Sequence, residues 1–295
     1  MVCLPHGIKQ EELINLLKKI GWEVSKNLKA YNQNIEDNDE FQRKLKIINL
    51  ESGPVTAADI EISELVKKRI KDQYPAINWD FLSEEDVKNN QKLEFKSKWV
   101  WIIDPIDGTK DFIKQTGQYA MHLALTYERE IILGIVPIPS KDQLWIYCQG
   151  RGTWYETRDT EETIIIPTTS KDISDLTILT SKSHITPQFQ DLLEKLCPKK
   201  VVRLGSVGYK VVSILSGEAN LYISYSSRNG SCPKDWDMAA PFGLIKGAGG
   251  SFTDLYSNDL VFLKDDNFEQ RGILIASLVQ NHQEVCKKIL DLFKN

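Results

Sequence analysis

The 295-residue chain has few cysteines, no long apolar run and no block of basic residues. Its five cysteines are scattered without a CxxC pair, which excludes a disulfide framework and a cysteine zinc site and favours a reducing compartment. No stretch approaches the roughly 18 consecutive apolar residues that a membrane span needs. Residues 1–10 lack both a basic and an apolar segment, so we expect no secretory signal and predict a cytoplasmic protein.

The composition is that of an ordinary globular protein. Lys and Arg number 37 and Asp and Glu number 41, which gives a formal net charge of −4. Hydrophobic residues make up 41% and charged residues 26%, which excludes a disordered chain. Because the chain is mildly acidic and has no basic block, we predict no nucleic-acid partner.

Hydrophobic spacing predicts an N-terminal half of two helices followed by a sheet. Apolar residues recur every three or four positions from Leu13 to Leu28, which indicates an amphipathic helix, and we expect it to give way to a polar surface loop or flap at 32–40. A second helix is predicted over 56–71, after Gly53-Pro54. The predicted strands are 99–103, 120–127, 131–137, 145–148 and 153–155.

A charged and then polar stretch, 158–172, separates this half from the rest of the chain. Beyond it, short apolar strands alternate with helical stretches, which is typical of an α/β layered domain. The predicted strands are 177–180, 201–204, 220–224 and 273–276, and the predicted helices are 187–196, 207–216, 237–246 and 281–293. We therefore expect two domains, an α+β domain over 1–165 and an α/β domain over 166–295.

The most informative segment is Asp104-Pro-Ile-Asp-Gly-Thr109, which follows the apolar run 99–103. A buried strand there delivers two carboxylates into a tight turn, where Pro105 fixes φ and Gly108 permits a close approach of the backbone. A helix that starts at Gly108-Thr109 would offer free N–H groups to an anion. A strand followed by a turn and a helix-capping aspartate, with no functional role, could have the same sequence. The other motifs of the chain therefore decide how this segment is interpreted.

Three other acidic stretches accompany it: Val55–Asp59, Phe81–Asp86 and Asp235–Ala240. Each has a structural explanation when taken alone. Thr56 and Asp59 form a capping box, Asp237 is a helix N-cap, and the Glu84 cluster is a solvated loop. It is improbable that all four stretches occur together for purely structural reasons.

In this order and spacing, the four stretches resemble the magnesium-dependent, lithium-sensitive phosphatases of the inositol monophosphatase superfamily, over roughly residues 10–280. Within it, five softer motifs are similar to the 3′(2′),5′-bisphosphate nucleotidase group: 54–59, 82–86, 107–113, 181–184, and Lys210 followed by 216–219. The resemblance implies an α/β (α+β) fold, a layered αβαβα sandwich of the inositol monophosphatase and fructose-1,6-bisphosphatase type, with the active site between the domains.

The resemblance also assigns roles to residues. The implied ligands of two or three Mg²⁺ ions are Glu84, Asp104, Asp107, Asp237 and the backbone carbonyl of Ile106, with Asp104 bridging two ions. Asp59 and the Thr109 hydroxyl would orient and deprotonate the attacking water. The implied substrate-binding residues are the amides of Gly108 and Thr109 at the phosphate, and Ser183, His184, Gly205, Ser206, Lys210 and Asp237 toward the rest of the substrate.

Elementary electrostatics also predicts that cations bind at these carboxylates. If five carboxylates converge, they cannot all stay ionised in one cleft, so either several take up protons or cations fill the site. Ligands that are all oxygen select Mg²⁺, and the absence of His and Cys from the motifs argues against zinc. Two such ions would stabilise the attacking and leaving oxygens, which favours direct attack by water.

The predicted reaction is hydrolysis of the 3′-phosphate of adenosine 3′,5′-bisphosphate, a by-product of sulfate assimilation, to AMP and phosphate. The sulfated nucleotide 3′-phosphoadenylyl sulfate is a second expected substrate. The alternatives are an inositol monophosphatase or fructose-1,6-bisphosphatase, and a phosphate-ligand binding protein that keeps the fold without catalysis. We expect a monomer or homodimer. The chain departs from the nucleotidase group at two places: Asn49–Ser52 stands where that group has a basic residue, and the segment 226–234 is longer. The sequence therefore does not assign the role of the flap in metal binding or the shape of the leaving-group pocket.

Overall fold

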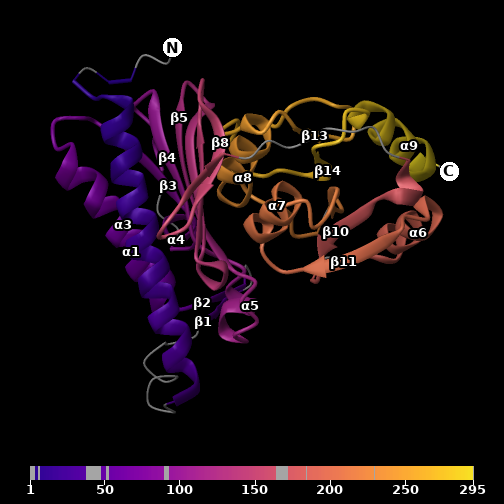
Figure 1. The fold of residues 1–295 in the computed structure, drawn as a ribbon, viewed down its shortest axis with the longest axis horizontal. Helices are drawn as coiled ribbons and strands as arrows, with labels where there is room; N and C mark the ends of the chain where they lie inside the picture. The colour runs from indigo at the N-terminus through magenta and orange to yellow at the C-terminus, as the bar shows by residue number, and fades with distance from the viewer. Residues whose placement is uncertain are drawn as a thin grey trace.

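The computed structural model describes residues 4–5, 7–37, 48–50, 53–89, 93–163, 172–183, 185–228 and 230–294. This part of the chain folds into alternating layers of helix and sheet (Figure 1). Among the described residues, no helix combines the length and the apolar character that crossing a bilayer requires.

Two β-sheets form the framework. The larger has seven strands in the order β3-β4-β5-β6-β7-β8-β9, antiparallel except for the parallel pair β3 and β4. Its strands are β3 (Asp80–Ser83), β4 (Trp99–Asp107), β5 (Ala120–Tyr127), β6 (Glu130–Ile138), β7 (Gln143–Cys148), β8 (Gly152–Glu156) and β9 (Glu161–Thr163). The smaller is mixed, in the order β11-β10-β12-β14-β13. Its strands are β10 (Thr177–Ser181), β11 (Lys200–Leu204), β12 (Leu221–Ser226), β13 (Ser251–Asp254) and β14 (Gly272–Ser277). A separate hairpin pairs β1 (Ile48–Leu50) with β2 (Gly53–Val55).

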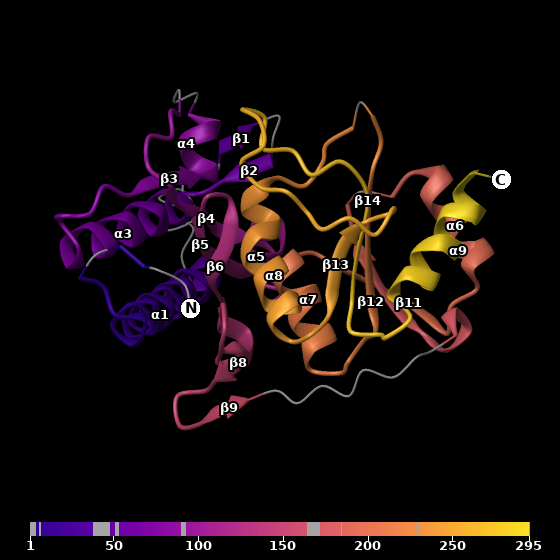
Figure 2. The same ribbon diagram turned by 90° about the horizontal axis from the view of Figure 1, so that it is seen from above.

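Helices cover both sheets and fill the space between them (Figure 2). The outer layer on the larger sheet is α1 (Gln10–Asp37) and α3 (Ala57–Gln73), and the middle layer is α7 (Val207–Leu215) and α8 (Asp235–Gly247). The outer layer on the smaller sheet is α6 (Pro187–Leu196) and α9 (His282–Lys294). The predicted layered αβαβα sandwich is confirmed.

Alternation along the central strand β4 shows how the layers are held together. Trp101 and Ile103 point into the core shared with α1 and α3, whereas Val100 and Ile102 point into the core shared with α7 and α8. Because successive side chains of a strand face opposite sides, a run that is apolar throughout is what a strand covered on both faces requires. The helices of the second half thus share a core with the sheet of the first, and the division at residue 165 stays a prediction.

Most predicted elements lie within a few residues of the observed ones, but α1 ends later than predicted, and the short elements β1, β2, α4 (Glu84–Lys88), β9 and β13 were not predicted. The loop predicted from residue 32 is wrong up to residue 37, because α1 continues to Asp37. Tertiary contacts hold this polar end: the Asn32 side chain donates to the Phe112 carbonyl (2.7 Å), and Gln115 Nε2 donates to the Asn32 carbonyl (2.5 Å). The rest of the predicted loop, residues 38–40, lies outside the described residues, as do residues 41–47 and 51–52. Strand β13 was not predicted, since it is only four residues long and follows the glycine-rich stretch 247–250.

His282, at the start of α9, makes the stability of this layer depend on pH. Its imidazole is buried between two hydroxyl groups, with Nδ1 2.7 Å from Ser277 Oγ and Nε2 2.9 Å from Thr253 Oγ1. Burial lowers the pKa of His282 from 6.5 to about 4, so the unfolded chain takes up this proton first as the pH falls. The stabilising contribution of neutral His282 is complete above about pH 6.5 and is lost as the pH falls toward 4.

We therefore predict that the free energy of unfolding, measured by urea titration, decreases between pH 6.5 and pH 4 by up to about 3 kcal/mol more in the wild type than in His282→Gln. Glutamine keeps hydrogen-bonding capacity but has no charge to gain. Equal pH dependence of the two proteins would contradict this role for His282.

Candidate metal centre

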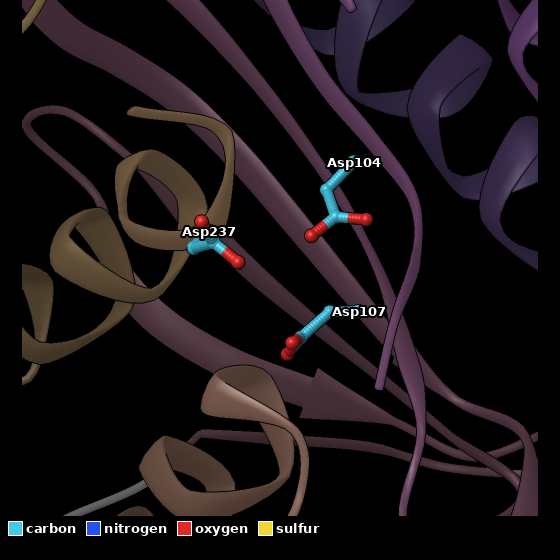
Figure 3. Close-up of side chains that lie close together, drawn as sticks. All are labelled: Asp104, Asp107 and Asp237. Carbon is cyan, nitrogen blue, oxygen red and sulfur yellow. The ribbon is translucent and has the colours of Figure 1, made fainter. Parts of the chain in front are cut away.

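Three carboxylates from two elements meet at the interface between the larger sheet and the middle helical layer. Asp104 and Asp107 come from the end of β4, and Asp237 comes from the first turn of α8 (Figure 3). One ligand oxygen from each lies within 4.8 Å of the others, and no other group of this kind is found in the described part of the chain. The structure thus brings together three of the five predicted carboxylates at ligand distance of one another.

A bulge in β4 puts both aspartates on one face. In a regular strand, residues three apart point to opposite faces. Here the register with β5 shifts between Asp104, which pairs with His122, and Asp107, which pairs with Ala120, so three steps along β4 match two along β5. The change of face is visible in the core, because Ile106 packs with Ile103 toward α1 and α3. The bulge therefore returns Asp107 to the face of Asp104, toward α8.

Asp107 is tied to the second half of the chain. Its Oδ2 accepts hydrogen bonds from Ser206 Oγ (2.5 Å) and from the Gly208 amide (2.8 Å), so the carboxylate caps the N-terminus of α7. His122 Nε2 lies 3.0 Å from the same oxygen. Burial opposes ionisation of Asp107, but His122, Lys210 and Ser206 outweigh burial and lower its pKa. We therefore expect Asp107 to be an anion at neutral pH.

Asp104 and Asp237 have the opposite electrostatic character. Burial, followed by the charges of Glu84, Asp107 and Asp237, raises the pKa of Asp104. Burial, Glu84 and Asp107 raise the pKa of Asp237 to about 7, although its Oδ2 accepts a hydrogen bond from the Lys234 amide (2.6 Å). Two carboxyl groups that resist ionisation beside a third that is ionised indicate a site short of positive charge.

Asp59 reaches the same electrostatic environment from α3. Its Oδ2 accepts from the amide and the hydroxyl of Thr56, both at 2.7 Å, so the predicted capping box is present. Burial raises the pKa of Asp59 to about 7, and Glu84 and Glu85 contribute to the rise. Helix capping therefore uses one oxygen of Asp59 and leaves the other oxygen for a second role.

Two buried carboxylate oxygens show where that second role lies. Within the described residues, Asp59 Oδ1 and Asp104 Oδ1 are buried and have no hydrogen-bond partner. A buried carboxylate oxygen without a partner is costly, and a bound cation removes that cost. The carboxylates, which all present oxygen, are the donor set of a hard divalent cation. The residues present therefore fit a divalent metal.

Glu84 joins the cluster as the first residue of the short helix α4 (Glu84–Lys88). Its charge contributes to the raised pKa values of Asp59, Asp104 and Asp237, and Lys88 Nζ lies 2.8 Å from its Oε1. The predicted cluster of Glu84 is therefore helical and partly buried, rather than a solvated loop.

The turn after β4 is built as its sequence predicts. Gly108 has φ +92° and precedes the helix α5 (Thr109–Ile113), and a Cβ atom at Gly108 would lie 2.9 Å from the Gln118 carbonyl oxygen. The Thr109 hydroxyl donates to the carbonyl of Ile106 (3.0 Å), which is the predicted backbone ligand. No residue with a side chain fits at position 108 without a shift of the backbone.

The residues predicted to bind the nucleotide lie in different settings. Ser206 and Lys210 are buried and have partners within the protein: Ser206 is bound to Asp107, and Lys210 Nζ donates to the carbonyls of Leu204 (3.2 Å) and Gly205 (2.7 Å). Lys210 is thus not a solvated surface lysine, and burial lowers its pKa to about 8. Ser183 is exposed, and His184 lies outside the described residues. Their roles toward substrate stay predictions.

Two residues of the site, His122 and Lys88, were missed by the sequence analysis, and the expectation that no histidine accompanies the acidic cluster is wrong, because His122 Nε2 lies 3.0 Å from Asp107 Oδ2. His122 lies on the mostly apolar, buried strand β5, and only its cross-strand pairing with Asp104 reveals its position. Lys88 follows Glu84 by four residues, a spacing that predicts an ion pair once α4 is known to be a helix.

The charges of the site do not balance within the protein. Two buried ammonium groups, those of Lys88 and Lys210, oppose the carboxylates. The carboxylates that act on one another are those of Asp59, Glu84, Glu85, Asp104, Asp107 and Asp237. The carboxylates therefore outnumber the ammonium groups, and divalent cations would supply the missing positive charge.

Comparison with known proteins agrees with this geometry. The chain is 27% identical over 228 residues to the 3′(2′),5′-bisphosphate nucleotidase CysQ of Escherichia coli K12, covering 77% of this chain and 86% of that protein. It is 26% identical over 270 residues to human 3′(2′),5′-bisphosphate nucleotidase 1, covering 85% of this chain and 77% of that protein.

Solved structures show the same fold. The extragenic suppressor protein SuhB of Bartonella henselae superposes with a TM-score of 0.74 at 19% identity, over 95% of this chain and 98% of that one. A staphylococcal IMPase-I, solved with its products, superposes with a TM-score of 0.71 at 20% identity, over 96% of each chain. The model of the inositol monophosphatase family matches residues 9–292. This chain, whose acidic cluster joins the larger sheet to the middle helical layer, therefore belongs to the inositol monophosphatase family.

Proposed function

We propose that this protein is a Mg²⁺-dependent 3′(2′),5′-bisphosphate nucleotidase that hydrolyses the 3′-phosphate of adenosine 3′,5′-bisphosphate to AMP and phosphate. The observation that carries the proposal is the cluster of the buried Asp104 and Asp107 with the half-buried Asp237, with its excess of negative charge. The names of the relatives in Escherichia coli and in humans support the nucleotide as substrate. 3′-Phosphoadenylyl sulfate is a second substrate in this proposal.

The metal ligands in this proposal are Glu84, Asp104, Asp107, Asp237 and the carbonyl of Ile106. The proposal places two or three ions there, and ligands that are all oxygen favour Mg²⁺ over zinc. Bound Mg²⁺ would neutralise charge on the phosphate and lower the pKa of a water molecule. By competition at one of these positions, Li⁺ would inhibit the enzyme.

The protein's own groups would position the phosphate and accept the proton. Burial raises the pKa of Asp59 to about 7, and one of its oxygens is buried without a partner, which suits a general base near neutral pH. Thr109 lies one residue beyond Gly108, and its hydroxyl is held by the carbonyl of Ile106. In the proposal, the amides of Gly108 and Thr109 contact the phosphate, and Thr109 with Asp59 orients the attacking water.

The nucleotide would lie beyond the phosphate, toward β10, β11 and α7. Ser183 and Gly205 are the residues of this region that contact it in the proposal, together with His184. Lys210 supports the nucleotide site in the proposal, because its hydrogen bonds to the Leu204 and Gly205 carbonyls hold the loop between β11 and α7. Ser206 acts through Asp107.

The proposed setting is the cytoplasm, where adenosine 3′,5′-bisphosphate arises from sulfate assimilation. Four cysteines, Cys148, Cys197, Cys232 and Cys286, are free thiols in the described part of the chain, which suits a reducing compartment.

The direct test is steady-state phosphate release from adenosine 3′,5′-bisphosphate, inositol 1-phosphate and fructose 1,6-bisphosphate. We expect the highest kcat/KM for the nucleotide, loss of activity in EDTA and recovery of activity with excess Mg²⁺. A preference for inositol 1-phosphate would contradict the nucleotidase assignment and leave the family unchanged. Mg²⁺-dependent binding of the nucleotide without hydrolysis of any of the three would favour the phosphate-binding alternative.

The role of Thr109 is tested by Thr109→Ala, with Thr109→Ser as the matched control. We predict that the alanine variant lowers kcat by about 10²–10⁴-fold, because it removes the hydroxyl that assists proton transfer. The serine variant should retain most of the activity. Both should bind Mg²⁺ with wild-type affinity in calorimetry, since the Ile106 carbonyl and the carboxylates remain. Near-normal turnover of Thr109→Ala would show that the catalytic pair is misplaced.

A further inference from the structure

Lys88 places a positive charge inside the acidic cluster. It is the last residue of α4, and only 6% of its side chain is exposed. Its Nζ lies 2.8 Å from Glu84 Oε1 and 3.3 Å from Glu85 Oε1. These glutamates are themselves 17% and 5% exposed, so all three charges lie largely out of water. A surface ion pair at this spacing contributes little, but a buried one has large electrostatic effects on its neighbours.

The influence of Lys88 extends beyond its two ion pairs. Burial opposes the charged form of Lys88, yet Glu84, Glu85 and Asp59 outweigh it and raise the Lys88 pKa. Lys88 in turn favours ionisation of Asp104 at the centre of the cluster. The ammonium group thus compensates the carboxylates of the N-terminal side, as Lys210 does for Asp107 and Asp237.

We propose that Lys88 is a built-in counter-cation of the metal centre: it holds Glu84 and Glu85 in the metal-free protein and weakens the binding of divalent cations by its charge. The proposal rests on the assignment of Glu84 as a metal ligand. Lys88 is a positioning residue here, since it acts through Glu84 and touches no reacting atom.

Two opposing consequences follow when the charge of Lys88 is removed. The metal-free protein loses the only ammonium group recorded within salt-bridge distance of Glu84 or Glu85 among the described residues, so its stability decreases. The cluster also becomes more negative by one charge, so a divalent cation binds more tightly. A lysine that merely held Glu84 in place would give the opposite metal result, because its loss would disorder a ligand.

Lys67 offers a matched control. It is a buried lysine on α3 whose Nζ lies 2.7 Å from Asp86 Oδ1 and 3.0 Å from Glu64 Oε1, and neither carboxylate belongs to the metal cluster. Lys67→Met therefore removes a comparable buried ion pair from the same region without changing the charge beside Glu84.

The experiment is calorimetric titration of Mg²⁺ into wild type, Lys88→Met, Lys88→Gln, Lys88→Arg and Lys67→Met, with melting temperatures recorded with and without the ion. We expect both neutral Lys88 variants to have a Kd lower by about tenfold or more, a lower melting temperature without metal and a larger rise on adding Mg²⁺. Lys88→Arg and Lys67→Met should keep a Kd within about threefold of wild type.

Unchanged or weaker Mg²⁺ binding by the neutral variants would overturn the role of Lys88 while leaving the metal centre intact. Lys88→Gln keeps a hydrogen-bond donor near Glu84, so it separates loss of charge from loss of position if Lys88→Met fails to fold. Absence of Mg²⁺ binding by the wild type would instead overturn the metal centre of the proposed function. Because calorimetry needs no substrate, neither result depends on the substrate assignment.

Discussion

Mutual repulsion of buried carboxylates is the constraint on which the site depends. The ligand oxygens of the three aspartates lie within 4.8 Å of one another, and at that limit, with an effective dielectric constant of about 20, two unit charges repel by about 3.5 kcal/mol in each of the three pairs. A fold of ordinary stability does not hold such a cluster ionised without counter-charges. The structure supplies some of them, in Lys88, Lys210 and the N-terminus of α7, and leaves a deficit that divalent cations fit.

The same carboxylates connect the two halves of the molecule. Asp107 belongs to the larger sheet, yet it caps α7, and Asp237 extends from α8 toward the sheet. Since α7 and α8 fill the space between the two sheets, the candidate metal centre lies where the larger sheet meets the middle layer. A change in the packing of this layer would therefore alter the distance between Asp237 and the two aspartates of β4. The ion and the interface would be expected to stabilise each other.

Much of this architecture was predictable from the sequence, and the failures have physical causes. The turn between Asp104 and Thr109 was predictable, because Pro105 fixes its own φ and Gly108 permits the positive φ that the turn requires. The bulge that brings Asp104 and Asp107 to one face could not be predicted, since it is a property of the pairing with β5. The position of His122 beside the aspartates could not be predicted for the same reason, since it depends on the pairing of β5 with β4. The end of α1 was predicted too early because Asn32 is held by contacts with residues about 80 positions away, which local composition does not encode.

The most direct test of the central claim is a crystal structure of the protein with Mn²⁺, a divalent ion that accepts the same oxygen ligands and can be located by its anomalous scattering. We predict anomalous peaks within coordination distance of the carboxylates of Asp104, Asp107 and Asp237, and a peak also bound by Glu84. A map without a peak at this cluster, obtained at saturating Mn²⁺ and neutral pH, would contradict the account.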